Sequence, residues 1–349
     1  MRRYADIWRS DQACCTVVGM TMTRTLGRSG IEVSALGMGC WAIGGPYWGG
    51  TQPYGWGAVD DDESVRTIHK GLDLGVDFFD TASSYGAGHS ERVLGRALRG
   101  RRDRVVIASK FGNTFDEQSK QALGPNGSVE YMRSCLDGIL RRLDTDYLDL
   151  YQFHLGDAEI HDAVALVDPL EELVRQGKIR AYGWSTDDPH RAEEFANAGA
   201  GCAAIQVHLN ALEDNAAMLR VCAAQGQAAI NRGPLAMGLL SGKYQDGHAV
   251  GRDDIRGQAP QWLRYFDNGV ATPQWRAKVE AVRAALTGGG RTLAQGSLGW
   301  LWARSPANIP IPGCRTVEQI EENAGALEHG PLSLREFEEV NRLVSELEA

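Results

Sequence analysis

The sequence predicts an α/β fold, a (β/α)8 TIM barrel, because two kinds of segment alternate along the chain. Eight short apolar runs end in polar residues, and the runs from the second to the sixth begin roughly 22 to 45 residues apart. Amphipathic stretches with helical spacing lie between these runs. One strand, one helix and two loops fill such an interval, and eight of these units are typical of a parallel barrel.

The expected strands and helices follow one another in order. The apolar runs occupy residues 34–41, 75–80, 104–110, 147–154, 179–185, 202–208, 227–233 and 308–313. Helical periodicity is clearest at residues 62–75, 90–100, 128–143 and 165–178. Asp, Ser or Glu stands near the start of these stretches and Gly or Lys near the end, as helix termini prefer.

Segments outside the eightfold repeat complete the predicted domain. Residues 23–34 contain a turn between two short extended pieces, which indicates a β-hairpin plugging the bottom of the barrel. Residues 333–347 form an extra C-terminal amphipathic helix. Residues 1–22 begin basic but lack a signal-peptide pattern, so we expect a flexible N-terminal extension followed by one domain over residues 23–349.

Two long loops interrupt the regular spacing. The first, residues 42–62, is rich in glycine and aromatic residues, and the second runs from about residue 244 to 273. Both follow predicted strands, so they fall at the carboxyl ends where barrel active sites are built. Long loops in a compact domain are usually functional.

Composition excludes several classes of function. The chain has 349 residues, a formal net charge of −9, and no apolar run of the length that crosses a membrane. The acidic balance disfavours nucleic acid and anionic membranes as partners. Seven scattered cysteines without C-x-x-C spacing favour neither disulfides nor a metal site, so we expect a reducing, cytoplasmic location.

Three ionisable residues end successive predicted strands. Asp80 ends the second, Lys110 the third and His154 the fourth, while Tyr85 lies in the loop after Asp80. Strand ends converge in a barrel, so these side chains are expected to share one pocket. A buried lysine needs a carboxylate such as Asp80, and its charge is expected to lower the pKa of Tyr85. The set suits proton transfer to a carbonyl oxygen.

Each of these residues also has a structural explanation. Asp80 fits a turn or cap, Lys110 a strand end exposed to solvent, His154 a core histidine and Tyr85 simple loop packing. The combination in this order is what favours catalysis.

These stretches, "FFDTASSYGAGHSERVLGRAL", "VVIASKFG" and "YLDLYQFH", resemble the aldo-keto reductase superfamily. The resemblance extends over about residues 23 to 330. It implies a barrel without a metal and the reduction of a small-molecule aldehyde or ketone by NADPH. It also implies that Tyr85 is the general acid, with Asp80, Lys110 and His154 as the other catalytic residues.

The resemblance also implies residues that hold the nicotinamide. "GWST" is similar to a motif in which Ser and Asn bind the carboxamide; Ser185 matches, and Thr186 stands where Asn is usual. Gln206 matches a carboxamide-binding glutamine. Arg232 stands where the family more often has Tyr or Trp against the nicotinamide, so we expect discrimination in favour of the reduced cofactor.

Two further motifs are similar to phosphate-binding parts of the family. The glycine-rich stretch at 231–244 supplies Gly233, Pro234, Leu235, Gly238, Leu240, Ser241 and Lys243. The stretch after the eighth strand supplies Gly313, Arg315, Thr316, Gln319, Glu322 and Asn323. A glycine turn into a helix start can hold a phosphate, and Arg315 adds a bidentate cation, which favours NADP(H) over NAD(H).

The substrate site is expected among aromatic residues. Trp41 follows the first strand, and the two long loops contribute the rest: Trp48, Tyr54, Trp56, Trp262 and Phe266. They suit an apolar mouth for a bulky carbonyl compound, although packing of one loop on the other explains them equally well.

Two other functions remain open at this point. One is a cofactor-binding regulatory subunit of the same fold with little turnover. The other is a barrel aldolase or isomerase in which Lys110 forms a Schiff base.

Overall fold

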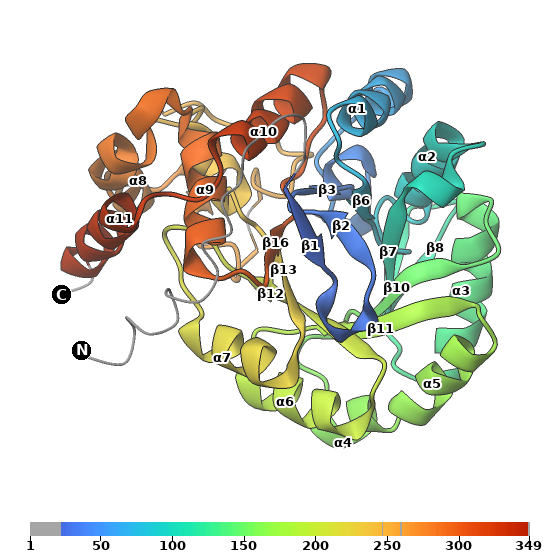
Figure 1. Ribbon diagram of the computed structural model, residues 1–349. Coiled ribbons are helices and arrows are strands. Elements are labelled where there is room, and N and C mark those ends of the chain that lie inside the picture. Colours follow the sequence, from blue (N-terminus) through green and yellow to red (C-terminus); the bar gives the residue numbers. More distant parts are fainter. Residues whose placement is uncertain (1–21, 246, 259, 348–349) are drawn as a thin grey trace.

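The predicted barrel is present in the computed structural model, which describes residues 22–245, 247–258 and 260–347. Eight parallel strands form its wall and helices surround them (Figure 1). The (β/α)8 prediction is confirmed. The predicted N-terminal extension lies, apart from Met22, outside the described residues.

Each predicted apolar run coincides with one barrel strand, and only the third strand extends beyond its run, by one residue. The strands are β3 (Gly37–Gly39), β6 (Phe78–Asp80), β7 (Val106–Phe111), β10 (Leu148–Phe153), β11 (Ile179–Ser185), β12 (Cys202–His208), β13 (Ala228–Arg232) and β16 (Asn308–Pro310). Their spatial order is their sequence order. A parallel bridge between Gly39 and Gly313 brings the first and last strands together, so the barrel is nearly closed.

Helices cover the outside of the barrel (Figure 1). They are α1 (Asp61–Asp73), α2 (His89–Leu98), α3 (Val129–Leu143), α4 (Ile160–Val164), α5 (Val167–Arg175), α6 (Pro189–Ala198), α7 (Ala216–Gln225), α8 (Pro273–Leu286), α9 (Leu293–Arg304), α10 (Val317–His329) and α11 (Leu334–Glu346). The stretch 165–178 forms a helix only from Val167 onward, because Pro169 lacks an amide hydrogen and is tolerated only in a first turn.

The N-terminal hairpin closes one end of the barrel. Strands β1 (Thr23–Thr25) and β2 (Glu32–Ser34) pair antiparallel and lie across the barrel opening in Figure 1. Leu26, Ile31 and Val33 are buried in a cluster with side chains of the barrel strands. A larger apolar cluster includes strand and helix residues. The predicted hairpin plug is therefore confirmed.

The two long loops and the segment after β7 contain short strands that the sequence pattern did not indicate. Strands β4 (Trp48–Gly49) and β5 (Gln52–Pro53) lie in the first loop, whereas β8 (Asn113–Asp116) and β9 (Gln121–Pro125) form a hairpin after β7. They assemble into one four-stranded sheet in the order β5-β4-β9-β8. The late loop contains β14 (Phe266–Asp267) and β15 (Val270–Ala271). Two-residue strands are too short for a periodic signal.

Two expectations from the composition, on membrane-spanning segments and on cysteines, concern residues within the described ranges. Over those ranges, no helix has the length and apolar character needed to span a bilayer. Cys40, Cys135, Cys202, Cys222 and Cys314 are buried and free.

Candidate active site

A cavity of about 1150 Å³ lies at the carboxyl ends of the barrel strands. Its lining includes Asp80, Ser185 and Gln206 at strand ends, together with residues of both long loops. The segments are far apart in sequence, and the parallel barrel brings their ends together. The cavity therefore lies where the sequence predicted the site.

Three of the predicted catalytic residues form a chain of contacts at the cavity. The Lys110 ammonium donates to Asp80 Oδ1 at 2.5 Å and to the Thr81 carbonyl at 2.8 Å. The distance from Lys110 Nζ to Tyr85 Oη is 3.2 Å. Lys110 is completely buried, and the Asp80 carboxylate compensates for the loss of water around its charge.

The pKa of Tyr85 differs from the prediction. Burial raises the pKa of the phenol, Asp80 adds to the rise, and the opposing effect of the Lys110 ammonium does not cancel them. The expected net decrease is therefore wrong, because loss of solvent disfavours the phenolate more than one cation favours it. Burial lowers the pKa of Lys110, but Asp80 and Tyr85 outweigh it and the pKa rises. Tyr85 is thus protonated and Lys110 charged at neutral pH.

Two glutamine side chains hold the other oxygen of Asp80. Gln206 Nε2 donates to Asp80 Oδ2 at 2.8 Å, and Gln152 Nε2 donates to the same oxygen at 3.0 Å. Gln152 was not predicted as a site residue. It lies two positions before His154, and the two-residue period of a strand would have placed it on the same side.

His154 lies beside Tyr85 at the cavity. The two ring centroids are 6.1 Å apart in an edge-to-face arrangement. Burial, followed by the positive charges of Lys110 and Arg232, holds the pKa of His154 well below its usual value. The imidazole is therefore neutral at pH 7 and can donate a hydrogen bond from one ring nitrogen.

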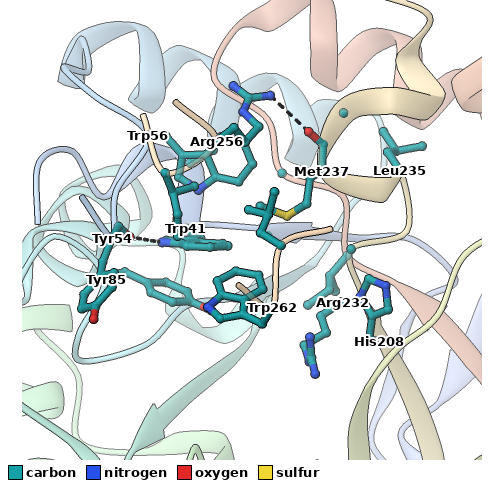
Figure 2. Close-up of a pocket in the computed structure, with 18 of the residues that line it drawn as sticks. Trp41, Tyr54, Trp56, Tyr85, His208, Arg232, Leu235, Met237, Arg256 and Trp262 are labelled. Atoms are coloured by element: carbon teal, nitrogen blue, oxygen red, sulfur yellow. Dashed lines mark hydrogen bonds between the residues drawn. The ribbon is translucent and has the colours of Figure 1, made fainter. Parts of the chain in front are cut away.

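Aromatic side chains form one wall of the cavity (Figure 2). The Trp41 ring stacks on Tyr85 with centroids 5.9 Å apart, and its indole Nε1 donates to the Tyr54 carbonyl at 2.9 Å. Trp56 meets Trp41 edge-to-face at 5.2 Å. Trp262 also lines the cavity and is 59% exposed. These four predicted substrate residues share one space.

The other two predicted substrate residues lie elsewhere. Phe266 is buried on β14 with its ring edge-to-face against Tyr244, at a centroid distance of 5.2 Å. Trp48 belongs to β4, which pairs with β5 and β9. Neither side chain is among the described residues that line the cavity. Both fit the alternative in which loop aromatics pack within the loops.

The ends of β11 and β13 line the cavity on the side of Ser185, Thr186 and Arg232. The Thr186 hydroxyl donates to the Gly156 carbonyl at 2.8 Å. The Arg232 guanidinium forms an ion pair with Asp187, and Asp187 Oδ1 also accepts the His208 amide at 2.7 Å. The charge expected of Arg232 is thus partly compensated by a neighbouring carboxylate.

The glycine-rich stretch after β13 runs along the cavity. It includes the 3-10 helix η4 (Ala236–Ser241). The cavity is lined by Gly233, Pro234, Leu235, Gly238, Ser241 and Lys243. Leu240 is completely buried and lies outside this lining set. One side of the short helix therefore faces the cavity, and the other packs on the core.

The turn from β16 into α10 forms the far end of the cavity. The residues that line it there are Gly313, Arg315, Gln319, Glu322 and Asn323. Thr316 is instead the N-cap of α10, with its hydroxyl accepting the Gln319 amide at 3.4 Å. The Arg315 guanidinium donates to the Trp56 carbonyl at 2.9 Å and to the Ala58 carbonyl. Arg315 therefore joins this turn to the first long loop.

Comparison with known proteins identifies the family. The model of the Aldo/keto reductase family matches residues 35–345. The chain belongs to this family. Aldo-keto reductase YhdN of Bacillus subtilis (strain 168) is 31% identical over 301 residues, covering 84% of this chain and 85% of that protein.

Solved structures of other aldo-keto reductases are similar over nearly the whole chain. The holo form of AKR11C1 from Bacillus halodurans has a TM-score of 0.74 at 26% identity, covering 93% of this chain and 96% of that one. An aldo-keto reductase from Klebsiella pneumoniae in complex with NADP and acetate has a TM-score of 0.64 at 26% identity, with the same coverage.

Arg256 is one further cavity residue of this aldo-keto reductase that the sequence pattern does not indicate. Arg256 lines the cavity, lies 4.5 Å above the Trp56 ring, and donates to the Met237 carbonyl at 3.1 Å (Figure 2). Its Nη2 pairs with Asp254 at 2.6 Å. It lies in the irregular late loop, where no periodicity marks one arginine from another.

Proposed function

We propose that this aldo-keto reductase reduces an aldehyde or ketone to an alcohol with NADPH, and that Tyr85 is the proton donor. The observation that carries the proposal is the contact chain from Asp80 through Lys110 to Tyr85, which ends in the cavity. Family membership supports the reaction class, and the Klebsiella pneumoniae relative in complex with NADP supports the cofactor.

The polar groups of the cavity fit a phosphorylated dinucleotide. Near Tyr85, Ser185, Thr186 and Gln206 offer hydroxyl and amide groups suited to a carboxamide. At the other end, Lys243 and Arg315 offer cations. The backbone around Gly313 leads into the start of α10, where amide hydrogens favour a phosphate. We therefore assign the nicotinamide to the Tyr85 end and the adenosine phosphate to the Arg315 end.

Three further sets of predicted residues extend this assignment along the cavity. Arg232 borders the nicotinamide. Gly233, Pro234, Leu235, Gly238 and Ser241 border the pyrophosphate, with Leu240 supporting them from the core. Gln319, Glu322 and Asn323 bind the adenosine, and Thr316 fixes the helix start that presents them.

In the proposed mechanism, the protein's own residues deliver a proton to the carbonyl oxygen of the substrate. NADPH, when bound, would supply a hydride. As negative charge develops on the carbonyl oxygen, the Tyr85 hydroxyl donates its proton to it. The Lys110 ammonium, 3.2 Å from the Tyr85 oxygen, then stabilises the phenolate. Neutral His154 donates a hydrogen bond that orients the carbonyl, and Asp80 keeps Lys110 charged.

The same geometry disfavours a Schiff-base lysine. An amine attacks a carbonyl only when it is neutral. Lys110 is instead held as an ammonium by contacts with Asp80, the Thr81 carbonyl and Tyr85, and its pKa is raised by Asp80 and Tyr85 despite burial. Borohydride trapping with a carbonyl substrate is expected to give no covalent adduct.

We propose that Arg232 weakens binding of the oxidised cofactor relative to the reduced one. A cation near a positively charged ring is unfavourable, although the Asp187 carboxylate offsets part of the effect. The measurement is the ratio of the NADPH and NADP⁺ dissociation constants in the wild type and in Arg232→Tyr. A ratio that does not change would contradict this role.

The proposal also covers the domain organisation, the partner and the cellular compartment of the enzyme. We infer that residues 23–349 act as one domain with a small carbonyl compound as its partner. The buried free cysteines, Cys40, Cys135, Cys202, Cys222 and Cys314, support a reducing compartment such as the cytoplasm.

The test of the function compares wild-type protein with Tyr85→Phe over a panel of aldehydes and ketones. Loss of NADPH absorbance measures turnover. We expect turnover of some carbonyl compound by the wild type and a decrease of about 100-fold or more in the variant. Cofactor binding without turnover of any carbonyl would favour the regulatory-subunit alternative.

A further inference from the structure

The backbone that follows Tyr85 is held in an unusual conformation. Gly86, Ala87 and Gly88 have positive φ values of 60°, 51° and 83°. Ala87 is costly there because its Cβ is crowded by the backbone in the left-handed region. Strain of this kind persists only where the surrounding structure imposes it. The contacts that impose it therefore also fix the position of Tyr85.

The first long loop packs directly on this segment. A Cβ on Gly86 would lie 1.7 Å from the carbonyl oxygen of Gly44, and a Cβ on Gly44 would lie 3.0 Å from the carbonyl carbon of Tyr85. Two backbones meet here without side chains between them. This contact limits the segment from one side, but it supplies no hydrogen bond to it.

The turn between β8 and β9 supplies a hydrogen bond from the other side. Lys120 Nζ donates to the Gly86 carbonyl at 3.1 Å. Lys120 itself has a positive φ of 60°. Its amide donates to the Asp116 carbonyl at 3.0 Å, and its carbonyl accepts the Trp48 amide at 2.9 Å. The lysine is thus fixed at both backbone groups, and its side chain reaches the strained segment.

A second residue of the same turn fastens the start of α2. Glu117 pairs with Arg92 and, at 2.9 Å, with Nη1 of Arg142. Arg142 Nε also pairs with buried Glu91 on α2 at 2.6 Å. A Cβ on Gly88 would lie 2.7 Å from Arg142 Cδ. Arg142 therefore lies against the end of the strained segment while Glu117 holds it in place.

The same hairpin lines the mouth of the cavity. Ala122, Gly124 and Pro125 of β9 are among the lining residues, and β9 pairs with β4 of the first loop through Trp48 and Gln121. One small sheet therefore borders the space for the substrate and contacts the backbone next to Tyr85. Neither Lys120 nor Glu117 is among the lining residues, so their effect must pass through that backbone.

We propose that the β8–β9 turn positions Tyr85, with Lys120 as the main positioning residue and Glu117 as the second. Both act by holding residues 86–88 in the left-handed conformation. The inference rests on the proposed function, because it assigns Lys120 a role only if Tyr85 is the acid. The positioning role of Lys120 and the acid role of Tyr85 are tested by different variants.

The test uses the full chain with Lys120→Met, which keeps the length of the side chain and removes the donor. The conservative variant is Lys120→Arg. The matched control is Lys178→Met, because Lys178 also forms an ion pair, with Asp137, but precedes the first residue of β11 and does not line the cavity. Three quantities are measured: amide hydrogen exchange over residues 84–90, kcat and KM for one carbonyl substrate, and the dissociation constant of NADPH.

We expect faster exchange at the amides of Ala87, His89 and Ser90, which donate to carbonyls of residues 84–86. We also expect kcat to fall about 10-fold while KM and the NADPH dissociation constant change less than about 2-fold. Misplacement of a reacting group by a fraction of an ångström has effects of this order. Lys120→Arg should restore most of kcat, and Lys178→Met should match the wild type.

Two results would overturn the inference. Unchanged exchange in Lys120→Met would mean that Lys120 does not hold the segment. Faster exchange with unchanged kcat would mean that the segment does not position the acid. Tyr85→Phe separates this second result from failure of the proposed function, since that variant loses turnover if Tyr85 is the acid and keeps it otherwise.

Discussion

The two ends of the cavity are built in different ways. At the Tyr85 end, Lys110 and Asp80 lie on neighbouring barrel strands, and their side chains are 0% and 2% exposed. At the far end, Arg315 is partly exposed and contacts carbonyls of a loop. Charged side chains at the buried end therefore interact strongly and have fixed positions. At the far end, solvent screens the interactions and the side chains can move.

Stability and binding therefore depend on different parts of the cavity. Barrel strands position the Asp80–Lys110 pair that supports the proposed acid Tyr85. Loops hold the aromatic residues proposed to contact the substrate, and the turn after β16 holds Arg315. Changes at the buried end should affect both stability and turnover, whereas changes at the loop end should affect binding with little loss of stability.

The largest expected effect is that of Lys110→Met. The substitution leaves Asp80 buried without its cation, which costs about 3–5 kcal/mol of unfolding free energy. Turnover should fall by about 100-fold or more, because Tyr85 loses the charge that stabilises its phenolate. Chemical denaturation and NADPH oxidation measure the two effects. Lys178→Met serves as the control, and wild-type stability in Lys110→Met would contradict the contrast between the two ends.

A second prediction concerns pH. Burial raises the pKa of Tyr85 above its ordinary value of about 10 and lowers that of His154 well below its ordinary value of about 6.5. The rate of reduction, as kcat/KM, should be flat from about pH 6 to 9 and decrease up to about 10-fold per unit only above that range, where Tyr85 loses its proton. An inflection near pH 6.5 that disappears in His154→Gln would show that His154 is not buried as a neutral group.

At the loop end, Arg315→Met should change cofactor selection. We expect the NADPH dissociation constant to rise about 10-fold, because a bidentate contact with a phosphate is lost, and that of NADH to change little. Fluorescence titration measures both, with the exposed Arg342→Met on α11 as the control. The melting temperature should stay within a few degrees of the wild type. An equal loss of affinity for NADH and NADPH would remove Arg315 from the phosphate site.

The smallest expected effect is that of Trp262→Ala. Its exposed ring borders the cavity mouth, so removal should raise KM about 2- to 5-fold for bulky aromatic aldehydes and leave small aliphatic aldehydes unaffected. Steady-state kinetics with both classes of aldehyde measure this. Leu334→Ala, another exposed apolar position, should leave both unchanged. Equal changes for both classes of aldehyde would argue against contact with the substrate.

Local patterns in the sequence accounted for most of the fold. Seven of the eight strands lie within the predicted apolar runs, β7 extends one residue beyond its run, and the helices at 62–75, 90–100 and 128–143 are present with ends shifted by at most two residues. Hydrophobic periodicity and terminal residues are local properties, so they can be read from neighbours in the chain. The small sheet of β4, β5, β8 and β9 was missed because β4 and β5 have two residues each, and because the pairing of β4 with β9 joins Trp48 to Gln121, which are distant in the sequence.

The composition of the proposed site was also predictable, but several of its interactions were not. The sequence placed Asp80, Tyr85, Lys110 and His154 in one pocket, and it identified the aromatic loops. It did not indicate that Gln152 binds Asp80, that Asp187 pairs with Arg232, or that Trp48 and Phe266 lie outside the cavity lining. Each of these depends on distances between separate segments.

The parallel barrel, its hairpin plug and the ionisable residues at the strand ends could be predicted without the structure, because each follows from order and spacing along the chain. The pKa values of these residues depend on the folded structure. Whether burial or the Lys110 charge governs the pKa of Tyr85 depends on how much solvent the folded protein removes around the phenol. That balance arises from packing between distant segments, which no local pattern encodes.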